Sequence, residues 1–333
     1  MSNIALVISE KEESSKFVNS KFARRTFRHF LYFARKNKLA ESVREINMYE
    51  NLNLYIIRLP FSLTELGFVN KNKIARFIKD ECEKREIKSL IIPDEIYNTC
   101  VIDGYAQNPF GGKYLYKCLL VNILDDIYLK RGIKIGDLDI VVIKGENDGE
   151  LYSVVRQLSP LVKYLSILTD SKDGIQHEID GIFGDYGLSI GISEDFSLAA
   201  RDADLIINLR NSFDTVKNMK VNPGAVIINY GGKDAVRFFD KGTLINEIEV
   251  GLPKKDFLWV DTSISRFFNN VQIAEIVLSH KTGLEDMVSA GIIDCSAAEK
   301  ISKEFVISGF RISNYIGRYG IIRTGDIRCV KAK

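Results

Sequence analysis

Short apolar runs alternate with segments of helical periodicity along most of this 333-residue chain. Parallel strands must be joined by crossovers, which are usually helices, so this order predicts parallel sheets covered by helices. The fold class we expect is α/β, with a doubly wound, Rossmann-like parallel sheet in the second half of the chain and a second α/β domain before it. The strands expected in the second half are 139–143, 164–169, 188–192, 204–209 and 224–230.

The same pattern predicts four parts in chain order. Residues 1–110 are expected to form an N-terminal α/β domain, and residues 111–136 a connecting helix with apolar positions at helical spacing. The Rossmann-like domain is expected over 137–260. A C-terminal helical segment, 261–333, is expected to pack back on the first domain. The elements expected within the first part are strands 4–8, 55–59 and 89–92 and helices 14–37 and 73–85.

The composition excludes several classes of protein. Hydrophobic residues make up 46% and charged residues 27%, as in ordinary globular domains. The net charge of +2 argues against a dedicated nucleic-acid binder, and no apolar run reaches the roughly 20 residues that cross a bilayer. Five scattered cysteines without a C-x-x-C pair favour a cytoplasmic location, and three widely separated histidines predict no metal site.

The turn after the first strand of a Rossmann sheet is where a dinucleotide binds. Here residues 145–150 have the sequence GENDGE. Gly145 fits the first position of the G-x-G-x-x-G fingerprint, whereas Asn147 stands at the second, Glu150 at the third, and Gly149 is one residue out of register. Gly145, Asn147 and Gly149 are therefore the candidate phosphate-binding residues, for NAD or NADP.

Three carboxylates, Glu146, Asp148 and Glu150, accompany this turn. Near a helix N-terminus each contributes about 0.3–1 kcal/mol to helix stability, because it complements the helix dipole. The same charges would repel a pyrophosphate approaching those amides. Two alternatives follow: a site that binds a dinucleotide, or a turn that its own side chains cap in place of a ligand.

Further candidates follow the later strands of the sheet. Asp170 ends the second strand, where an acidic residue commonly accepts hydrogen bonds from a ribose, and Lys172 is placed to tolerate a 2′-phosphate. The alternative for Asp170 is a turn cap. The loops after the fourth and fifth strands lie at the sheet edge where open α/β sheets bind ligands, or are simply solvated. Their candidate residues are Asn208, Arg210, Gly231, Gly232 and Lys233.

A helix-containing segment at 112–142 precedes the Rossmann pattern, and a helix with the sequence VQIAEIVL at 271–278 follows it. This layout resembles the amino-acid-dehydrogenase-like Rossmann superfamily, which includes shikimate dehydrogenases, glutamyl-tRNA reductases and long-chain acyl-(acyl-carrier-protein) reductases, over residues 110–285. The resemblance implies a homo-oligomeric NAD(P)-dependent oxidoreductase that acts on a small carbonyl or hydroxy compound.

The chain departs from this superfamily at the catalytic positions. Gln272 stands where the acyl reductases have a nucleophilic cysteine, although it matches a substrate-contacting glutamine of shikimate dehydrogenases. The Lys/Asp pair of those enzymes has no matching motif, and Lys113 is a candidate by residue type only, with Asp94 and Asp103 as possible partners. Lys113 and Gln272 are thus the candidate catalytic residues. The alternative hypothesis is a non-catalytic, Rossmann-derived ligand-binding or regulatory module.

One local charge imbalance is hidden by the balanced total. Eight Lys and Arg residues, and no Asp or Glu, lie between Lys16 and Lys38. They fall on the first expected helix, opposite an apolar stripe. The segment is either a solvated helix face or a docking surface for an acidic partner such as a carrier protein, an RNA or an anionic membrane surface.

Overall fold

The computed structural model describes residues 2–10, 42–49, 52–99, 108–172, 175–196, 200–211, 219–232, 239 and 241–327. The chain forms two compact units. Unit 1 is Met1–Gly111 with Pro253–Ile273, and unit 2 is Gly112–Leu252 with Ala274–Lys333. The basic segment between Lys16 and Lys38 lies outside the described residues, so the prediction of a basic helix stays a prediction.

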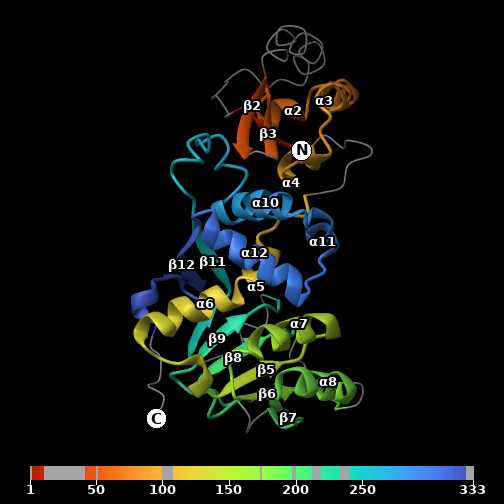
Figure 1. The fold of residues 1–333 in the computed structure, drawn as a ribbon. Coiled ribbons are helices and arrows are strands. Elements are labelled where there is room, and N and C mark those ends of the chain that lie inside the picture. Colours follow the sequence, from red (N-terminus) through yellow and green to blue (C-terminus); the bar gives the residue numbers. More distant parts are fainter. Residues whose placement is uncertain are drawn as a thin grey trace. The chain divides into compact units, whose positions relative to one another are not determined.

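Unit 1 contains a four-stranded mixed sheet in the order β2-β3-β1-β4 (Figure 1). β1 is parallel to β3 and β4, as the sequence pattern predicts, whereas β2 is antiparallel to β3. β2 carries no apolar run and has a single buried residue, so periodicity alone did not predict it. The elements of unit 1 are β1 (Ser2–Ser9), β2 (Val43–Tyr49), β3 (Leu52–Leu59), β4 (Ser89–Ile91), α2 (Leu63–Leu66), α3 (Lys71–Lys84) and α4 (Asp94–Tyr97).

The core of unit 1 lies between this sheet and α3. Ile74, Ile78 and Cys82 recur at helical spacing on α3 and are buried with Val7 and Ile57 of the sheet. Asn70 begins α3, because its side chain accepts a hydrogen bond from the Asn72 amide at 3.1 Å.

Unit 2 contains a six-stranded sheet in the order β10-β9-β8-β5-β6-β7, and all neighbouring strands are parallel. This is the doubly wound order of Rossmann domains, so the α/β fold class is confirmed. Every residue of β5, β8 and β9 is buried, which explains their continuous apolar sequences. The strands are β5 (Ile140–Ile143), β6 (Tyr164–Leu168), β7 (Ser189–Ser193), β8 (Leu205–Asn208), β9 (Val226–Asn229) and β10 (Thr243–Ile245).

The strand order reverses between β5 and β8, which are neighbours in the sheet but are separated in the chain by β6 and β7. The carboxyl ends of two such strands diverge into loops on opposite faces of the sheet and leave a crevice between them. This topological switch point positions the candidate site.

Seven helices of the described chain belong wholly or mostly to unit 2. The expected connecting helix is divided at Leu119, which serves as the C-cap of one helix and the N-cap of the next. The helix between β6 and β7 was not predicted. The helices are α5 (Lys113–Cys118), α6 (Leu120–Ile127), α7 (Asp148–Leu158), α8 (Gln176–Tyr186), α10 (Asn270–Thr282), α11 (Glu285–Ala290) and α12 (Cys295–Ile307).

The C-terminal part differs from the expected helical segment. Helices α10 and α12 lie in this part, but a three-stranded antiparallel sheet also forms, from β11 (Glu247–Gly251), β12 (Arg311–Gly317) and β13 (Gly320–Ile322). Tyr315 of β12 is fully buried and donates a hydrogen bond to Asp126 Oδ2 of α6 at 2.7 Å. Residues 274–333 group with unit 2, and the packing of 261–333 on the first domain stays a prediction.

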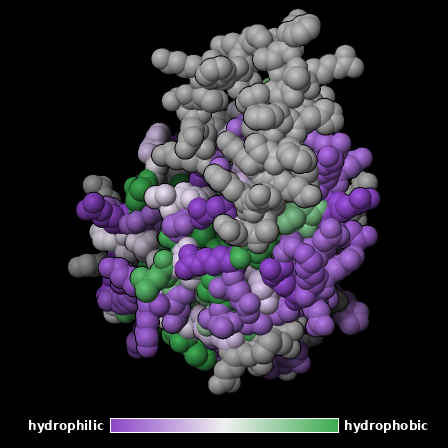
Figure 2. All heavy atoms as spheres, turned by 90° about the horizontal axis from the view of Figure 1, so that it is seen from above, coloured by the Kyte–Doolittle hydropathy of each residue, from purple (hydrophilic) through white to green (hydrophobic). Residues whose placement is uncertain are grey.

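Hydrophilic side chains cover most of the described surface on the face shown in Figure 2, with hydrophobic ones in small groups between them. In the described part of the chain, no helix has the length and apolar character needed to span a bilayer. The described residues also contain no group of three or more His, Cys, Asp or Glu side chains placed to hold a metal ion.

Gly181 of α8 offers a test of the local structure. A Cβ at this position meets no atom within 4 Å, so Gly181→Ala is expected to raise the free energy of unfolding by about 0.5–1 kcal/mol, the difference in helix propensity. Gly187, the C-cap of the same helix, has a φ of +68°, and Gly187→Ala is expected to lower stability by about 1 kcal/mol. Urea unfolding of both variants measures these changes. The same sign for both would contradict this description of α8.

Candidate functional site

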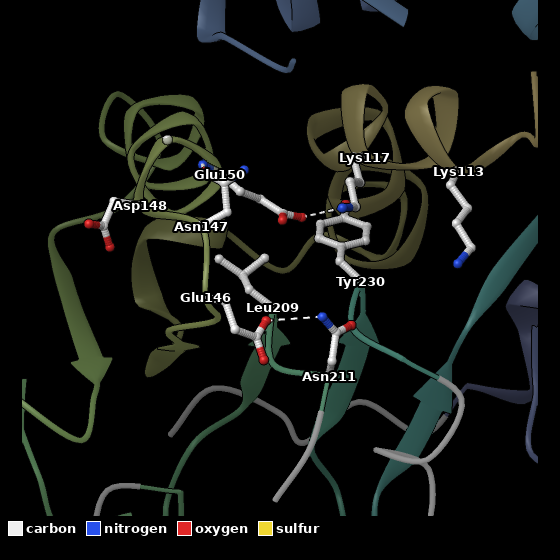
Figure 3. A pocket seen from close by; sticks show the side chains of 10 residues that line it. Lys113, Lys117, Glu146, Asn147, Asp148, Glu150, Leu209, Asn211 and Tyr230 are labelled. Atoms are coloured by element: carbon white, nitrogen blue, oxygen red, sulfur yellow. Dashed lines mark hydrogen bonds and ion pairs between the residues drawn. The ribbon is translucent and has the colours of Figure 1, made fainter. Parts of the chain in front are cut away.

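A pocket of about 660 Å³ lies at the carboxyl edge of the sheet, at the switch point between β5 and β8 (Figure 3). Its volume is in the range of small-molecule sites, about 300–1,000 Å³. All of its lining belongs to unit 2 and comes from α5, the β5–α7 turn, the first turn of α7 and the loops after β8 and β9. The lining residues are Lys113, Lys117, Glu146, Asn147, Asp148, Gly149, Glu150, Leu209, Asn211 and Tyr230.

Two glycines let the backbone segments around this edge pass very close together. A Cβ on Gly145 would lie 2.3 Å from the carbonyl oxygen of Leu209, and a Cβ on Gly231 would lie 1.9 Å from that of Arg210. Only glycine fits either position without movement of the backbone. The first glycine of the fingerprint is therefore required by the packing of the turn against the β8 loop, whether or not a ligand binds.

Asn147, at the second fingerprint position, is the N-cap of α7. Its Oδ1 accepts a hydrogen bond from the Glu150 amide at 3.3 Å. Amides at a helix N-terminus are the groups that bind a phosphate in Rossmann domains. One of them is thus occupied by a side chain of the turn itself.

Each of the three carboxylates of the turn has a partner. Asn211 Nδ2 donates to Glu146 Oε2 at 3.0 Å, Lys144 Nζ lies 2.7 Å from Asp148 Oδ1, and Lys117 forms an ion pair with Glu150. Figure 3 shows the Lys117–Glu150 and Asn211–Glu146 contacts as dashed lines across the pocket. Lys117 and Asn211 were not predicted as site residues, because only the sheet order brings α5 and the β8 loop to the turn.

Asp170 and Arg210, which were predicted as separate candidates, form a bidentate ion pair. The guanidinium Nη1 and Nη2 lie 3.0 and 2.6 Å from the two carboxylate oxygens of Asp170. Arg210 is mostly buried and also lies over the ring of Phe196, at 5.6 Å from its centroid. Lys172 follows Asp170 by two residues and has an exposed side chain. Its backbone amide donates a hydrogen bond to Glu194 Oε1 at 3.2 Å. Both carboxylate oxygens of Asp170 are therefore engaged by the guanidinium of Arg210.

A chain of asparagine amides, two of them buried, supports the loops of the site. Asn208 Nδ2 donates to Asn229 Oδ1 at 2.7 Å and to the Arg210 carbonyl at 3.0 Å, while Asn229 Nδ2 donates to Asn246 Oδ1 at 2.9 Å. The Arg210 amide in turn donates to Asn208 Oδ1 at 3.2 Å. Because the side chain of Asn208 is fully buried and bonded in this way, it holds the β8 loop against the β9 loop.

Tyr230 forms one wall of the pocket. Its ring meets that of Tyr116 edge-on at 4.8 Å between centroids, and its hydroxyl donates to the Tyr116 carbonyl at 3.4 Å. Burial raises the pKa of Tyr230 well above its ordinary value, as it does for Tyr116, whose hydroxyl donates to the Ile245 carbonyl at 2.9 Å. Both side chains are thus neutral phenols whose protons are bonded to the backbone.

The two candidate catalytic residues have different surroundings. Lys113 is exposed and lines the pocket, and its ammonium makes no hydrogen bond or ion pair in the described part of the chain. Gln272 belongs to unit 1 and does not line the pocket. Its Oε1 accepts from the Asn269 amide at 3.0 Å, and its Nε2 donates to the Phe110 carbonyl at 3.1 Å. Asp103 and Lys233 lie outside the described residues.

No family model matches the chain, and no curated protein matches it significantly. Among solved structures, the chain is similar to the Δ1-pyrroline-2-carboxylate reductase of Thermococcus litoralis in complex with NADH and L-proline, at 12% identity and a TM-score of 0.29, over 38% of this chain and 41% of that one. It therefore spans less than half of that reductase.

Two further solved structures cover more of the chain. The aspartate transcarbamoylase of Trypanosoma cruzi matches at 9% identity and a TM-score of 0.30, over 72% of this chain and 75% of that one. The 5,10-methylenetetrahydrofolate dehydrogenase of the silkworm Bombyx mori matches at 15% identity and a TM-score of 0.24, over 92% and 89%. Similarities of this extent assign the chain to no family and no activity.

Proposed function

We propose that this protein is an NAD(P)-dependent oxidoreductase-like protein that acts on a small carbonyl or hydroxy compound, with its cofactor at the carboxyl edge of the unit 2 sheet. The observation that carries the proposal is the position of the pocket. It lies at the switch point between β5 and β8, directly beside the glycine turn, where doubly wound sheets bind dinucleotides.

The residues at this edge divide between the two ends of such a cofactor. Gly145, Gly149 and Gly231 would border its phosphates and nicotinamide, and Asp170 with Lys172 would meet the adenosine ribose. The bound dinucleotide would supply or accept the hydride. Lys113 would face the substrate from the pocket wall.

Gln272 is the second residue proposed to face the substrate, on the strength of the family resemblance. Its amide is hydrogen-bonded to Asn269 and Phe110, and because it has a second N–H and a second lone pair on Oε1, contact with a substrate does not require those bonds to break.

A second candidate function is a non-catalytic ligand-binding or regulatory module. Three features favour it: Asn147 caps the helix that would receive the phosphates, the carboxylates of the turn are held by neighbouring side chains, and Arg210 engages both oxygens of Asp170. In this hypothesis, side chains of the protein occupy the groups that would otherwise bind the phosphates and the ribose of a dinucleotide.

Titration of the full-length protein with NADH and with NADPH separates the two functions. Saturable binding, followed by cofactor fluorescence or calorimetry, is expected if the first proposal is correct. No binding at millimolar cofactor would contradict it and leave the non-catalytic module.

Asp148→Asn is expected to tighten binding of NADH about threefold at low salt, since the substitution removes a negative charge at the phosphate position and frees Lys144. The gain should shrink as salt is added, because the Asp148 side chain is more than half exposed and its charge is screened. Asp185→Asn, on the exposed surface of α8, is the matched control and should leave the affinity unchanged. Equal affinities of Asp148→Asn and wild type would contradict the repulsion by the acidic turn.

A further inference from the structure

The sheet of unit 2 ends at β7, whose outer edge is open (Figure 1). In the described part of the chain, β6 is the only strand that pairs with β7, in a register that runs from Tyr164–Ser189 to Leu168–Ser193 without a bulge. No residue of β7 is buried, whereas every residue of β5, β8 and β9 is buried. The outer N–H and C=O groups of β7 therefore face solvent and can pair with a further strand.

β7 also lacks the features by which edge strands usually avoid such pairing. Its sequence, SIGIS, contains no charged residue and no proline. The other described edge strands differ, because β2 and β11 carry charged residues and β4, β10 and β13 have only three residues each. Among the edge strands that the structure describes, β7 is thus the only one that is both uncharged and longer than three residues.

Exposed aromatic side chains gather around this edge. Of the four large aromatic residues that are exposed in the described part of the chain, three flank β7. Tyr164 lies beside Ser189 in the strand register and is 69% exposed. Phe183 and Tyr186 lie one turn apart on α8, the helix that leads into β7, and are 58% and 47% exposed. Aromatic residues are enriched in protein–protein interfaces, so these side chains favour a protein partner at this edge.

The edge of β7 is complementary to itself. In an antiparallel pairing of two copies centred on Gly191, each residue before Gly191 lies opposite the residue at the same distance after it, so isoleucine meets isoleucine and serine meets serine. The nearest carboxylates, Glu194 and Asp195, lie opposite Leu188 and Gly187 of the other copy and not opposite one another. An uncharged strand that matches itself in this way fits a second copy of the chain.

We propose that β7 forms the interface of a homodimer, in which two copies pair their β7 strands antiparallel about a two-fold axis at Gly191. The two six-stranded sheets form one continuous sheet, and the α8 helices of the two copies lie on the same face of it. Stable interfaces bury about 1,200–2,000 Å² in total, more than one strand pair supplies, and Tyr164 and the aromatic residues of α8 provide further area. Because no residue of β7 lines the pocket, the dimer does not depend on the proposed function.

Sedimentation velocity of the full-length protein tests the proposal, with Gly191→Lys as the diagnostic variant. A side chain at this position fits the monomer, because its Cβ would lie 3.6 Å from Ser166 Oγ, an ordinary contact, and its backbone is not in the left-handed region. In the dimer, two lysines would meet at the two-fold axis. Wild type is expected to be a dimer at high micromolar concentration, and the dissociation constant of Gly191→Lys is expected to be about tenfold higher or more.

Ile321→Lys is the matched control, because Ile321 is 64% exposed and also lies on an edge strand, β13. This variant should remain a dimer. Ser189→Lys, at an exposed position of β7, should dissociate and supplies the same test if Gly191→Lys does not fold. A monomeric wild type, or a dimer that the folded β7 variants leave intact, would overturn the proposal.

Hydrogen exchange provides a test without any substitution. The amides of residues 189–193 are expected to exchange more slowly as the concentration of wild type is raised through the range of dimerisation, because the outer amides gain partners in the second strand. Exchange in β2, the charged edge strand of unit 1, should not change with concentration. If the protein sediments as a dimer while exchange in β7 is independent of concentration, the interface lies elsewhere and the proposal is wrong.

Discussion

Glu275→Leu is expected to destabilise unit 2 by about 2–6 kcal/mol, the largest effect of any single substitution discussed for this protein. Glu275 lies on α10 and is 2% exposed. Its two carboxylate oxygens accept hydrogen bonds from the amides of Gly112 at 2.7 Å and Leu115 at 2.8 Å, at the start of α5. Leucine fills a similar volume but leaves two buried donors without an acceptor, at about 1–3 kcal/mol each.

Urea unfolding followed by circular dichroism measures this loss. Glu299→Leu is the matched control, because Glu299 lies on α12, is mostly exposed and pairs with Lys303. Its substitution is expected to change stability by about 0.5 kcal/mol or less. A Glu275→Leu variant as stable as Glu299→Leu would show that the carboxylate does not hold the start of α5.

The same carboxylate makes stability depend on pH. Burial raises the pKa of Glu275 from 4.5 to about 7, against the opposing effect of the amides of Leu115, Gly112 and Tyr114. The folded state therefore binds a proton more tightly than the unfolded state. Stabilisation relative to a non-titrating side chain is complete below pH 4.5 and is lost as the pH rises through about 7, by about 3 kcal/mol in all.

The comparison with Glu275→Gln isolates this titration, because all other groups are shared. The difference in unfolding free energy between wild type and Glu275→Gln is expected to fall between pH 4.5 and about 7 and to be flat above that range. A difference that rises with pH in this range would contradict the raised pKa.

Gly231→Ala is expected to cost about 3 kcal/mol and to abolish binding in the pocket. The new Cβ would lie 1.9 Å from the Arg210 carbonyl oxygen and 2.9 Å from Asn208 Nδ2. The first contact is with backbone, and the second is with the buried asparagine chain, so neither group moves without breaking the hydrogen bonds between the β8 and β9 loops.

Gly232→Ala, one residue later, is the matched control for this substitution. The nearest atom to its Cβ is the Asn211 carbonyl oxygen at 3.2 Å, which a small shift accommodates. Urea unfolding and NADH titration of both variants test the prediction. Equal stability of the two variants would contradict the close approach of the loops at Gly231.

Much of the fold was predictable because central strands of a parallel sheet are buried on both faces. β5, β8 and β9 are continuous apolar runs, and the chain has no other way to bury them. β2 and the β12–β13 hairpin were missed, since strands with few buried residues leave no such run. The connecting helix at 111–136 was predicted as one element, and hydrophobic periodicity does not show its division at Leu119.

The candidate site was predictable by position but not by its contacts. The order of strands and the residues after each strand placed Gly145, Asp170, Asn208, Arg210 and Gly231 at one sheet edge. Two contacts were not predictable, the ion pair of Arg210 with Asp170 and that of Lys117 with Glu150. Both depend on which loops and helices the sheet order makes neighbours.

By itself, the sequence determined that this protein has an α/β fold with a Rossmann-like sheet and an acidic glycine turn, because burial and turn geometry act over a few residues. Only the tertiary structure decided which charges of that turn are neutralised and which remain available. Ion pairs form between side chains that are distant in the chain, and their partners are chosen by the packing of α5 and the β8 loop around the switch point.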